Sequence, residues 1–172
     1  MALYFPAPKW VGSYVEMAKF GHRRKSGARI HAGCDLYAPL ESDVVAVDGG
    51  IVVELNPGFS GHTAAIAIRH EGIGVIRYGE VIKITEEYNK VGAKIKSGER
   101  VVIAKIGRAV AKLSPMLHFE LYDGFGVGPL SDRVHKIEYK NEDVLKDANY
   151  ERRADLMNPT KFLERLWLEG IK

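Results

Sequence analysis

The stretch "DVVAVDGGIVVEL", residues 43–55, decides the fold, because two short runs rich in β-branched residues meet at Gly49-Gly50. Such runs favour strands, and paired glycines favour a turn between them. The pattern continues in "TAAIAIRHEG" (63–72) and "GVIRYGEVIKI" (74–84), which the turn signal Glu71-Gly72 separates. Short strands at turn-rich intervals predict an all-β sandwich or barrel built from antiparallel strands.

The β pattern extends through "VGAKIKSGERVVIAKIG" (91–107) and closes with "PMLHFELYDG" (115–124). The tail differs, because it is charged with sparse apolar residues, and "PTKFLERLWLEG" (159–170) predicts a short helix that begins at its proline and packs on the β core. We therefore predict a mainly β fold with an N-terminal extension over 1–19, a β-rich domain over 20–124 and a partly helical C-terminal extension over 125–172.

The composition of the chain argues against nucleic acid and membranes as partners. The chain has 172 residues, enough for one domain with a core, and its net charge of +3 is too small to indicate a nucleic-acid partner. No run approaches the roughly 20 apolar residues of a membrane span, so we expect no membrane partner. The N-terminus lacks a basic start followed by an apolar run, which predicts no secretory signal. The single cysteine, Cys34, excludes an intrachain disulfide, and we expect a buried thiol.

Two polar residues in "GARIHAGCDLYAP" (27–39) are candidate metal ligands. His31 and Asp35 lie four residues apart, and an extended chain of that length spans roughly 13 Å. The chain must therefore bend before both side chains can reach one ion, and Gly33 permits a bend. This pair alone leaves two interpretations open, half of a metal site or a polar turn before a strand.

A third candidate lies in "MLHFEL" (116–121). A strand's period of two puts Met116, His118 and Glu120 on one face and the apolar residues between them on the other, which is the predicted core face. His118 then points away from the core, and with His31 and Asp35 it completes a three-ligand set of a kind that suits zinc. An ordinary half-exposed histidine is the alternative, and Glu120 either orients a ligand or faces solvent.

Several landmarks resemble the M23 (lysostaphin-type, LytM-like) zinc metallopeptidases, in the order of that family and over about residues 20–122. "FGHRR" (20–24) is similar to the family's FGxR opening, "RIHAGCDLYAP" (29–39) to HxGxDxxAP, "RYGE" (77–80) to Y-x-H, and "SPMLHFEL" (114–121) to PHLHFE. "LMNPTKFL" (156–163) resembles the closing NP…L. The glycine spacing at 91–107 is also similar to lipoyl-type β-rolls, but no lysine on a tight hairpin accompanies it.

The resemblance implies that zinc is the cofactor and that His31, Asp35 and His118 are its ligands. It also shows two departures, because Glu80 and Met116 stand where the family has histidines that assist catalysis. A carboxylate can act as a general base, whereas a thioether cannot move a proton, so Glu80 is the predicted base. His62, in "PGFSGHT", and His22, in "FGHRR", are further catalytic candidates.

For three other polar residues we expect no direct part in catalysis. We expect His70 at the surface, Tyr78 in the core on the same strand face as Glu80, and His135 in a structural or exposed role.

The function that this resemblance implies is zinc-dependent hydrolysis of peptide bonds in bacterial peptidoglycan. We expect the protein to act at the bacterial cell wall, either after export by a route that needs no N-terminal secretory signal or as a trimmed piece of a longer protein. Two alternatives stay open. The first is a catalytically degenerate module that binds the cell wall or a cell-wall enzyme, and the second is a piece of a larger assembly such as a phage particle or secretion system. Retention of all three predicted ligands favours the enzyme.

Overall fold

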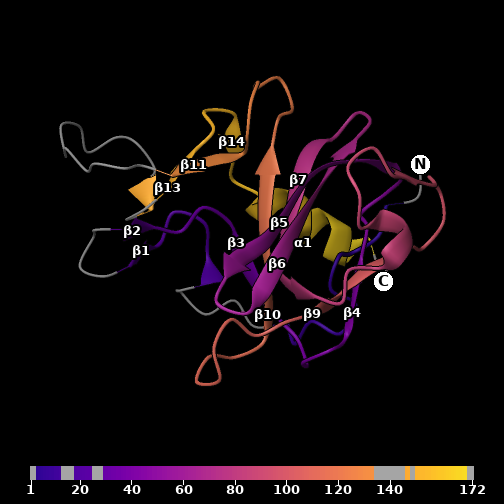
Figure 1. The fold of residues 1–172 in the computed structure, drawn as a ribbon. Coiled ribbons are helices and arrows are strands. Elements are labelled where there is room, and N and C mark those ends of the chain that lie inside the picture. Colours follow the sequence, from indigo (N-terminus) through magenta and orange to yellow (C-terminus); the bar gives the residue numbers. More distant parts are fainter. Residues whose placement is uncertain (1–2, 13–17, 25–28, 134–145, 148–149, 170–172) are drawn as a thin grey trace.

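The computed structural model describes residues 3–12, 18–24, 29–133, 146–147 and 150–169 (Figure 1). Its first strands are β1 (Arg23–Arg24), β2 (Arg29–Ile30), β3 (Cys34–Tyr37), β4 (Asp43–Val45), β5 (Gly50–Ser60), β6 (Thr63–His70) and β7 (Gly74–Ile82). After the short 3₁₀ helix η3 (Glu86–Tyr88) come β8 (Lys94–Ile95), β9 (Val102–Ile106), β10 (Met116–Tyr122), β11 (Ser131–Arg133), β12 (Lys146–Asp147), β13 (Tyr150–Arg152), β14 (Leu156–Met157) and helix α1 (Thr160–Leu168). The predicted mainly β class with a short C-terminal helix is confirmed.

Among the described residues, nine strands form the main sheet, in the order β14-β10-β7-β6-β5-β8, with β3 on β10 and with β9 bridging β7 and β4. All of these pairings are antiparallel. The glycine pair that opens β5 permits a close packing, because a Cβ at Gly49 would lie 2.3 Å from the backbone nitrogen of Ser97. The predicted hinge is thus a point of close contact with the turn that follows β8.

The core lies on one face of this sheet, between the central strands and α1 (Figure 1). On β10 the residues Leu117, Phe119 and Leu121 face it, as the alternation predicted, and on β7 it contains Ile76 and Tyr78. The opposite face of β7 and β10 carries Arg77, His118 and Glu120, which are also buried. The sheet therefore has an apolar face and a buried polar face, and the candidate site lies on the polar one.

Both ends of the described chain add to the apolar core. Phe5 stacks on Trp10 with ring centroids 5.3 Å apart, and Trp167 of α1 packs edge-on against both rings. Leu163 and Leu166 of α1 are fully buried, which confirms the predicted apolar face of the helix. Among the described residues, no helix is long and apolar enough to span a membrane.

Candidate metal centre

His31, Asp35 and His118 converge on one point. Nε2 of His31 lies 3.0 Å from Oδ1 of Asp35 and 3.2 Å from Nδ1 of His118, and that Nδ1 lies 2.9 Å from the same carboxylate oxygen. All three residues are buried, with exposed fractions of 1%, 1% and 7%. The structure thus brings together the three predicted ligands from two distant parts of the chain.

Hydrogen bonds on the outer side of each ring set its tautomer. Nδ1–H of His31 donates to the carbonyl of Lys19 at 2.8 Å, which leaves Nε2 with its lone pair facing inward. Nε2–H of His118 donates to Oε1 of Glu120 at 2.9 Å, which leaves Nδ1 facing inward. A carboxylate behind a ligating imidazole is the usual outer support of a metal site.

The three inward atoms fit a tetrahedral cation. Nitrogen and oxygen ligands lie about 2.0–2.2 Å from Zn²⁺, so two ligands of a tetrahedron are about 3.3–3.6 Å apart. The separations of 2.9–3.2 Å need outward shifts of less than an ångström to reach that spacing. Two imidazole lone pairs and a carboxylate at such distances repel one another unless a proton or metal ion lies between them.

The electrostatics of the cluster favour positive charge. Burial alone would lower the pKa of His118, but its hydrogen bonds to Asp35 and Glu120 and their negative charges raise that pKa to about 9. Burial would raise the pKa of Asp35, yet the hydrogen bonds from His118 and His31 hold it well below its usual range. The two carboxylates therefore favour the protonated form of His118, and a metal ion that bound here would have to displace that proton.

Strand pairing positions two of these ligands. β3 pairs with β10 so that Asp35 lies directly opposite His118. Cys34, its neighbour on β3, points into the core and is fully buried, as predicted. Gly33 permits a close approach, because a Cβ at this position would lie 2.3 Å from the carbonyl oxygen of Phe119. His31 comes from the segment before β3, where its N–H donates to the carbonyl of His22 at 3.0 Å.

Glu80 lies at a bulge in β7. Gly79 pairs with Ala65 and Val81 with Ala64, so Glu80 is the extra residue between two pairs, and its φ is 57°. Gly79 is also the residue opposite His118 on β10, which places Glu80 next to the ligand's cross-strand partner. Its Oε2 atom is buried. The bulge breaks the alternation, so the expectation that Glu80 and Tyr78 share a strand face no longer follows.

The other histidines have different surroundings. His62 is exposed on the turn between β5 and β6, and its N–H donates to the carbonyl of Ala109. His22 is half-buried and hydrogen-bonds the main chain of His31. His70 was expected at the surface, and this was wrong, because its side chain is buried between the carbonyl of Gly49 and the hydroxyl of Tyr78. His135 lies outside the described residues.

A charged network behind His118 was not predicted. Glu120 is fully buried, and its Oε1 accepts hydrogen bonds from His118 and from Nε of Arg152 at 2.9 Å, which rules out the solvent-facing alternative. Its Oε2 accepts from Tyr122 at 2.6 Å and from Arg77 at 3.1 Å. Burial alone would raise the pKa of Glu120, but Arg152, His118 and Arg77 hold it well below its usual range.

The sequence holds one signal for this network. Arg77 is a charged residue that directly follows the apolar pair Val75-Ile76, and in the structure it lies directly opposite Glu120 on β10. Arg77 also binds Glu54 on β5 at 2.6 Å. Phe59, at the end of β5, lies over the same face, with its ring centroid 5.7 Å from that of His118. A Cβ at Gly79 would lie 2.6 Å from the Phe59 ring, so this glycine gives the ring its place.

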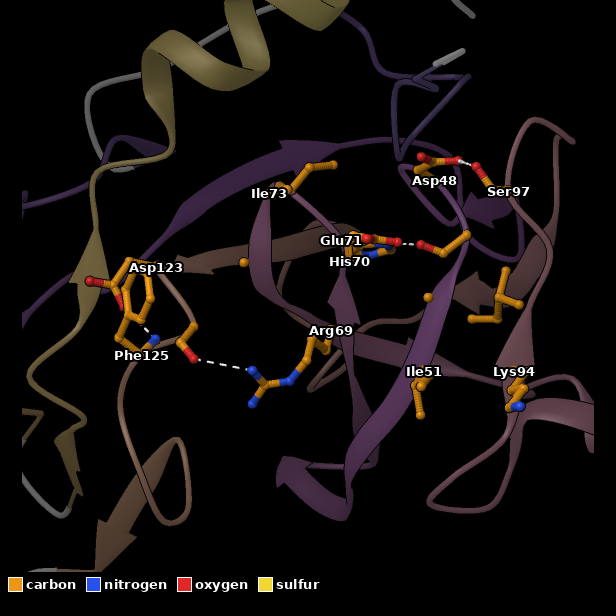
Figure 2. A pocket seen from close by; sticks show the side chains of 16 residues that line it. Asp48, Ile51, Arg69, His70, Glu71, Ile73, Lys94, Ser97, Asp123 and Phe125 are labelled. Carbon is orange, nitrogen blue, oxygen red and sulfur yellow. Dashed lines mark hydrogen bonds between the residues drawn. The ribbon is translucent and has the colours of Figure 1, made fainter.

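A hollow of about 780 Å³ lies away from the His/Asp/His cluster, at the end of β6 that carries His70 (Figure 2). Its polar side chains mostly hold loops in place. Asp48 accepts from Ser97 at 2.8 Å, Arg69 donates to the carbonyl of Gly124 at 3.1 Å, and Asp123 accepts from the N–H of Phe125 at 2.8 Å. The candidate metal cluster is not part of its lining.

The fold and the His/Asp/His cluster together define a β-sheet protein with a candidate metal centre. A family model for peptidase family M23 matches residues 29–129, which include all three converging residues. The chain belongs to peptidase family M23. A search of curated proteins finds no match.

Solved structures agree in fold. The catalytic domain of the antimicrobial peptidase lysostaphin from Staphylococcus simulans is 19% identical with a TM-score of 0.56, and the match covers 90% of this chain and 92% of that domain. Against a longer lysostaphin chain, the TM-score is 0.59 and the match covers 96% of this chain and 56% of that one. A zinc-containing peptidase from Vibrio cholerae is 23% identical with a TM-score of 0.52, over 70% of this chain and 36% of its own.

Proposed function

We propose that this protein is a zinc-dependent endopeptidase that hydrolyses peptide bonds of bacterial cell-wall peptides. The observation that carries the proposal is the convergence of Nε2 of His31, Oδ1 of Asp35 and Nδ1 of His118 within 3.2 Å of one another. Two neutral imidazoles and one carboxylate are a donor set that zinc accepts, and three protein ligands leave a fourth position for water or substrate. Membership in a peptidase family supports the reaction class.

The chain's own residues divide the work as follows. His31, Asp35 and His118 would hold the ion, which, when bound, polarises the scissile carbonyl and lowers the pKa of water. Glu80 would accept the proton that the attacking water loses, because a carboxylate can act as a general base and the bulge in β7 sets Glu80 next to Gly79, the residue opposite His118. Phe59 covers one side of His118 and limits access of bulk water to that ligand.

Metal content is the first test. Elemental analysis of protein loaded with zinc and then dialysed is expected to find one ion per chain, and Asp35→Asn is expected to lose it. Absence of stoichiometric metal in the wild type would remove the hydrolase proposal.

Glu80 is the second test. With zinc bound, Glu80→Gln is expected to lower kcat on purified peptidoglycan by about 10²–10⁴-fold while metal content stays unchanged. Glu71→Gln, at an exposed turn, is the matched control and should retain the wild-type rate. Equal rates for Glu80→Gln and the wild type would exclude Glu80 as the base. His22→Gln and His62→Gln in the same assay test the two remaining predicted catalytic residues.

A second candidate function is binding without turnover, and the side chain of Met116 favours it. Met116 lies on the strand face of His118 where the family resemblance places a histidine, and a thioether neither transfers a proton nor stabilises an oxyanion. Under this alternative the protein binds zinc and cell-wall peptides but releases no new amino groups from any muropeptide. Introducing the histidine with Met116→His would then create activity.

A further inference from the structure

A hollow of about 550 Å³ lies at the segment that hydrogen-bonds His31, one of the three predicted metal ligands. It is lined by residues 19–23, that is Lys19, Phe20, Gly21, His22 and Arg23. Among the described residues, its lining includes no aspartate or glutamate. Lys19 and Arg23 are exposed, and neither makes an ion pair with any described residue. Two cations that have no acidic partner among the described residues therefore border a hollow that is large enough for part of a peptide.

Several other basic residues of the described chain differ from Lys19 and Arg23 because they make ion pairs with acidic residues. Arg77 and Arg152 are held by Glu120, Arg153 by Asp155, and Lys105 by Asp43. These side chains hold structural ion pairs, whereas Lys19 and Arg23 make no ion pair within the part of the chain that the structure describes and can bind an incoming anion. Lys provides a mobile charge, and the planar guanidinium of Arg matches a carboxylate with two parallel hydrogen bonds.

The hollow is tied directly to a predicted metal ligand. The carbonyl of Lys19 accepts the Nδ1–H of His31 at 2.8 Å, the N–H of Gly21 donates to the carbonyl of His31 at 2.8 Å, and the N–H of His31 donates to the carbonyl of His22 at 3.0 Å. These three hydrogen bonds fix the lining segment against His31. A group bound in the hollow is thus held at a set place relative to the metal centre.

We propose that this hollow is a subsite for a carboxylate of the peptide substrate, bound by Lys19 and Arg23. This inference rests on the proposed function, because it names the part of the substrate that lies beside the reacting bond. Cell-wall peptides offer two kinds of carboxylate, the free C-terminus and the α-carboxylate of a γ-linked glutamate. Both present the same chemistry to the two cations, so the experiment distinguishes them.

The test is calorimetric binding to metal-free protein kept in chelator, so that neither coordination to zinc nor turnover contributes. The probes are a synthetic L-Ala-γ-D-Glu-L-Lys-D-Ala peptide, its C-terminal amide and its Glu α-amide. The wild type is expected to bind the free acid about tenfold more tightly than one of the two amides, and the amide that loses affinity identifies the carboxylate.

The Lys19→Gln/Arg23→Gln double variant is expected to bind the acid and both amides equally. The control is Lys94→Gln/Arg108→Gln, which removes the same charge from two exposed residues away from this hollow and should keep the preference for the acid. Equal binding of acid and amides by the wild type overturns the subsite, as does an equal loss of preference in the control. Since no arm needs zinc or catalysis, a protein that binds no metal or cleaves nothing still gives a clear answer on this subsite.

Discussion

At the scale of single residues, Glu80 combines an unusual backbone conformation with a place beside the cross-strand partner of His118. Glu80 has φ of 57°, a backbone conformation that L-residues other than glycine adopt at a cost of about 1–3 kcal/mol. It stands at a bulge beside the cross-strand partner of His118. A strained glutamate there is consistent with a side chain retained for chemistry rather than for stability.

Replacing Glu80 with glycine therefore separates stability from activity. Glu80→Gly is expected to raise the free energy of unfolding by about 0.5–1 kcal/mol, because glycine adopts positive φ freely, and to lower kcat at least 100-fold. Urea unfolding and a peptidoglycan assay measure the two effects. Lys83→Gly is the control, since φ there is 50° and its exposed ion pair with Glu41 contributes little. It should gain stability and keep activity, and a destabilised Glu80→Gly would show that the bulge is unstrained.

Glu120 gives the second prediction at this scale. Glu120→Gln removes a negative charge and disturbs the hydrogen bond that orients His118, so zinc affinity is expected to fall about 10–100-fold. Competition with a fluorescent chelator measures it. Glu54→Gln is the matched control, because Glu54 also binds Arg77 but makes no hydrogen bond or ion pair with His118 among the described residues. An unchanged affinity in Glu120→Gln would show that His118 needs no such support.

At the scale of elements, strand alternation predicted which way His118 points, because β10 is regular along its whole length. The same rule failed at Glu80, since one inserted residue reverses the face and leaves no mark in the apolar pattern. It also could not pair Arg77 with Glu120, because the pairing depends on the register between β7 and β10. His70 ends a strand in sequence, but it is buried by contacts to Gly49 and Tyr78.

Helix α1 offers a direct test of packing at this scale. Leu166 is fully buried against the core, so Leu166→Ala is expected to lower the free energy of unfolding by about 2–5 kcal/mol through lost burial and a residual cavity. Leu168 on the same helix is 83% exposed, and Leu168→Ala should change the free energy of unfolding by less than about 0.5 kcal/mol. Equal effects of the two variants in urea unfolding would mean that α1 does not dock as described.

At the scale of the whole molecule, residues near both ends of the described chain contact the main sheet and its core. β14 pairs with β10, Arg152 of β13 reaches Glu120, and Trp167 packs with Phe5 and Trp10. Arg152 and Trp167 lie beyond the stretch that the family model matches, and their contacts join residues far apart in the chain. Local patterns cannot reveal such contacts, so the sequence predicted the tail helix but not the role of the tail behind the metal centre.

The buried side chain of His70 makes the free energy of unfolding of the whole molecule depend on pH. Burial lowers the pKa of His70, against the opposing influence of its hydrogen bond to Gly49 and of the charge of Asp48. The folded protein therefore binds fewer protons at this group than the unfolded chain, whose histidine has a pKa of about 6.5. The stabilisation that His70 contributes is complete above that pH and is lost as the pH falls below it, toward the lowered folded-state pKa.

His70→Gln removes the titration and keeps a side chain able to donate to the carbonyl of Gly49. In chelator, the stability difference between wild type and His70→Gln is expected to be constant above about pH 7 and to shift against the wild type below pH 6.5, by at most about 1.4 kcal/mol per pH unit. Urea unfolding at pH 7.5, 6.5, 5.5 and 5.0 measures it. The predicted metal ligands are the same in both proteins, so their contribution to the pH dependence cancels in the stability difference. A difference that is flat with pH would mean that His70 stays neutral on unfolding or protonates freely in the fold.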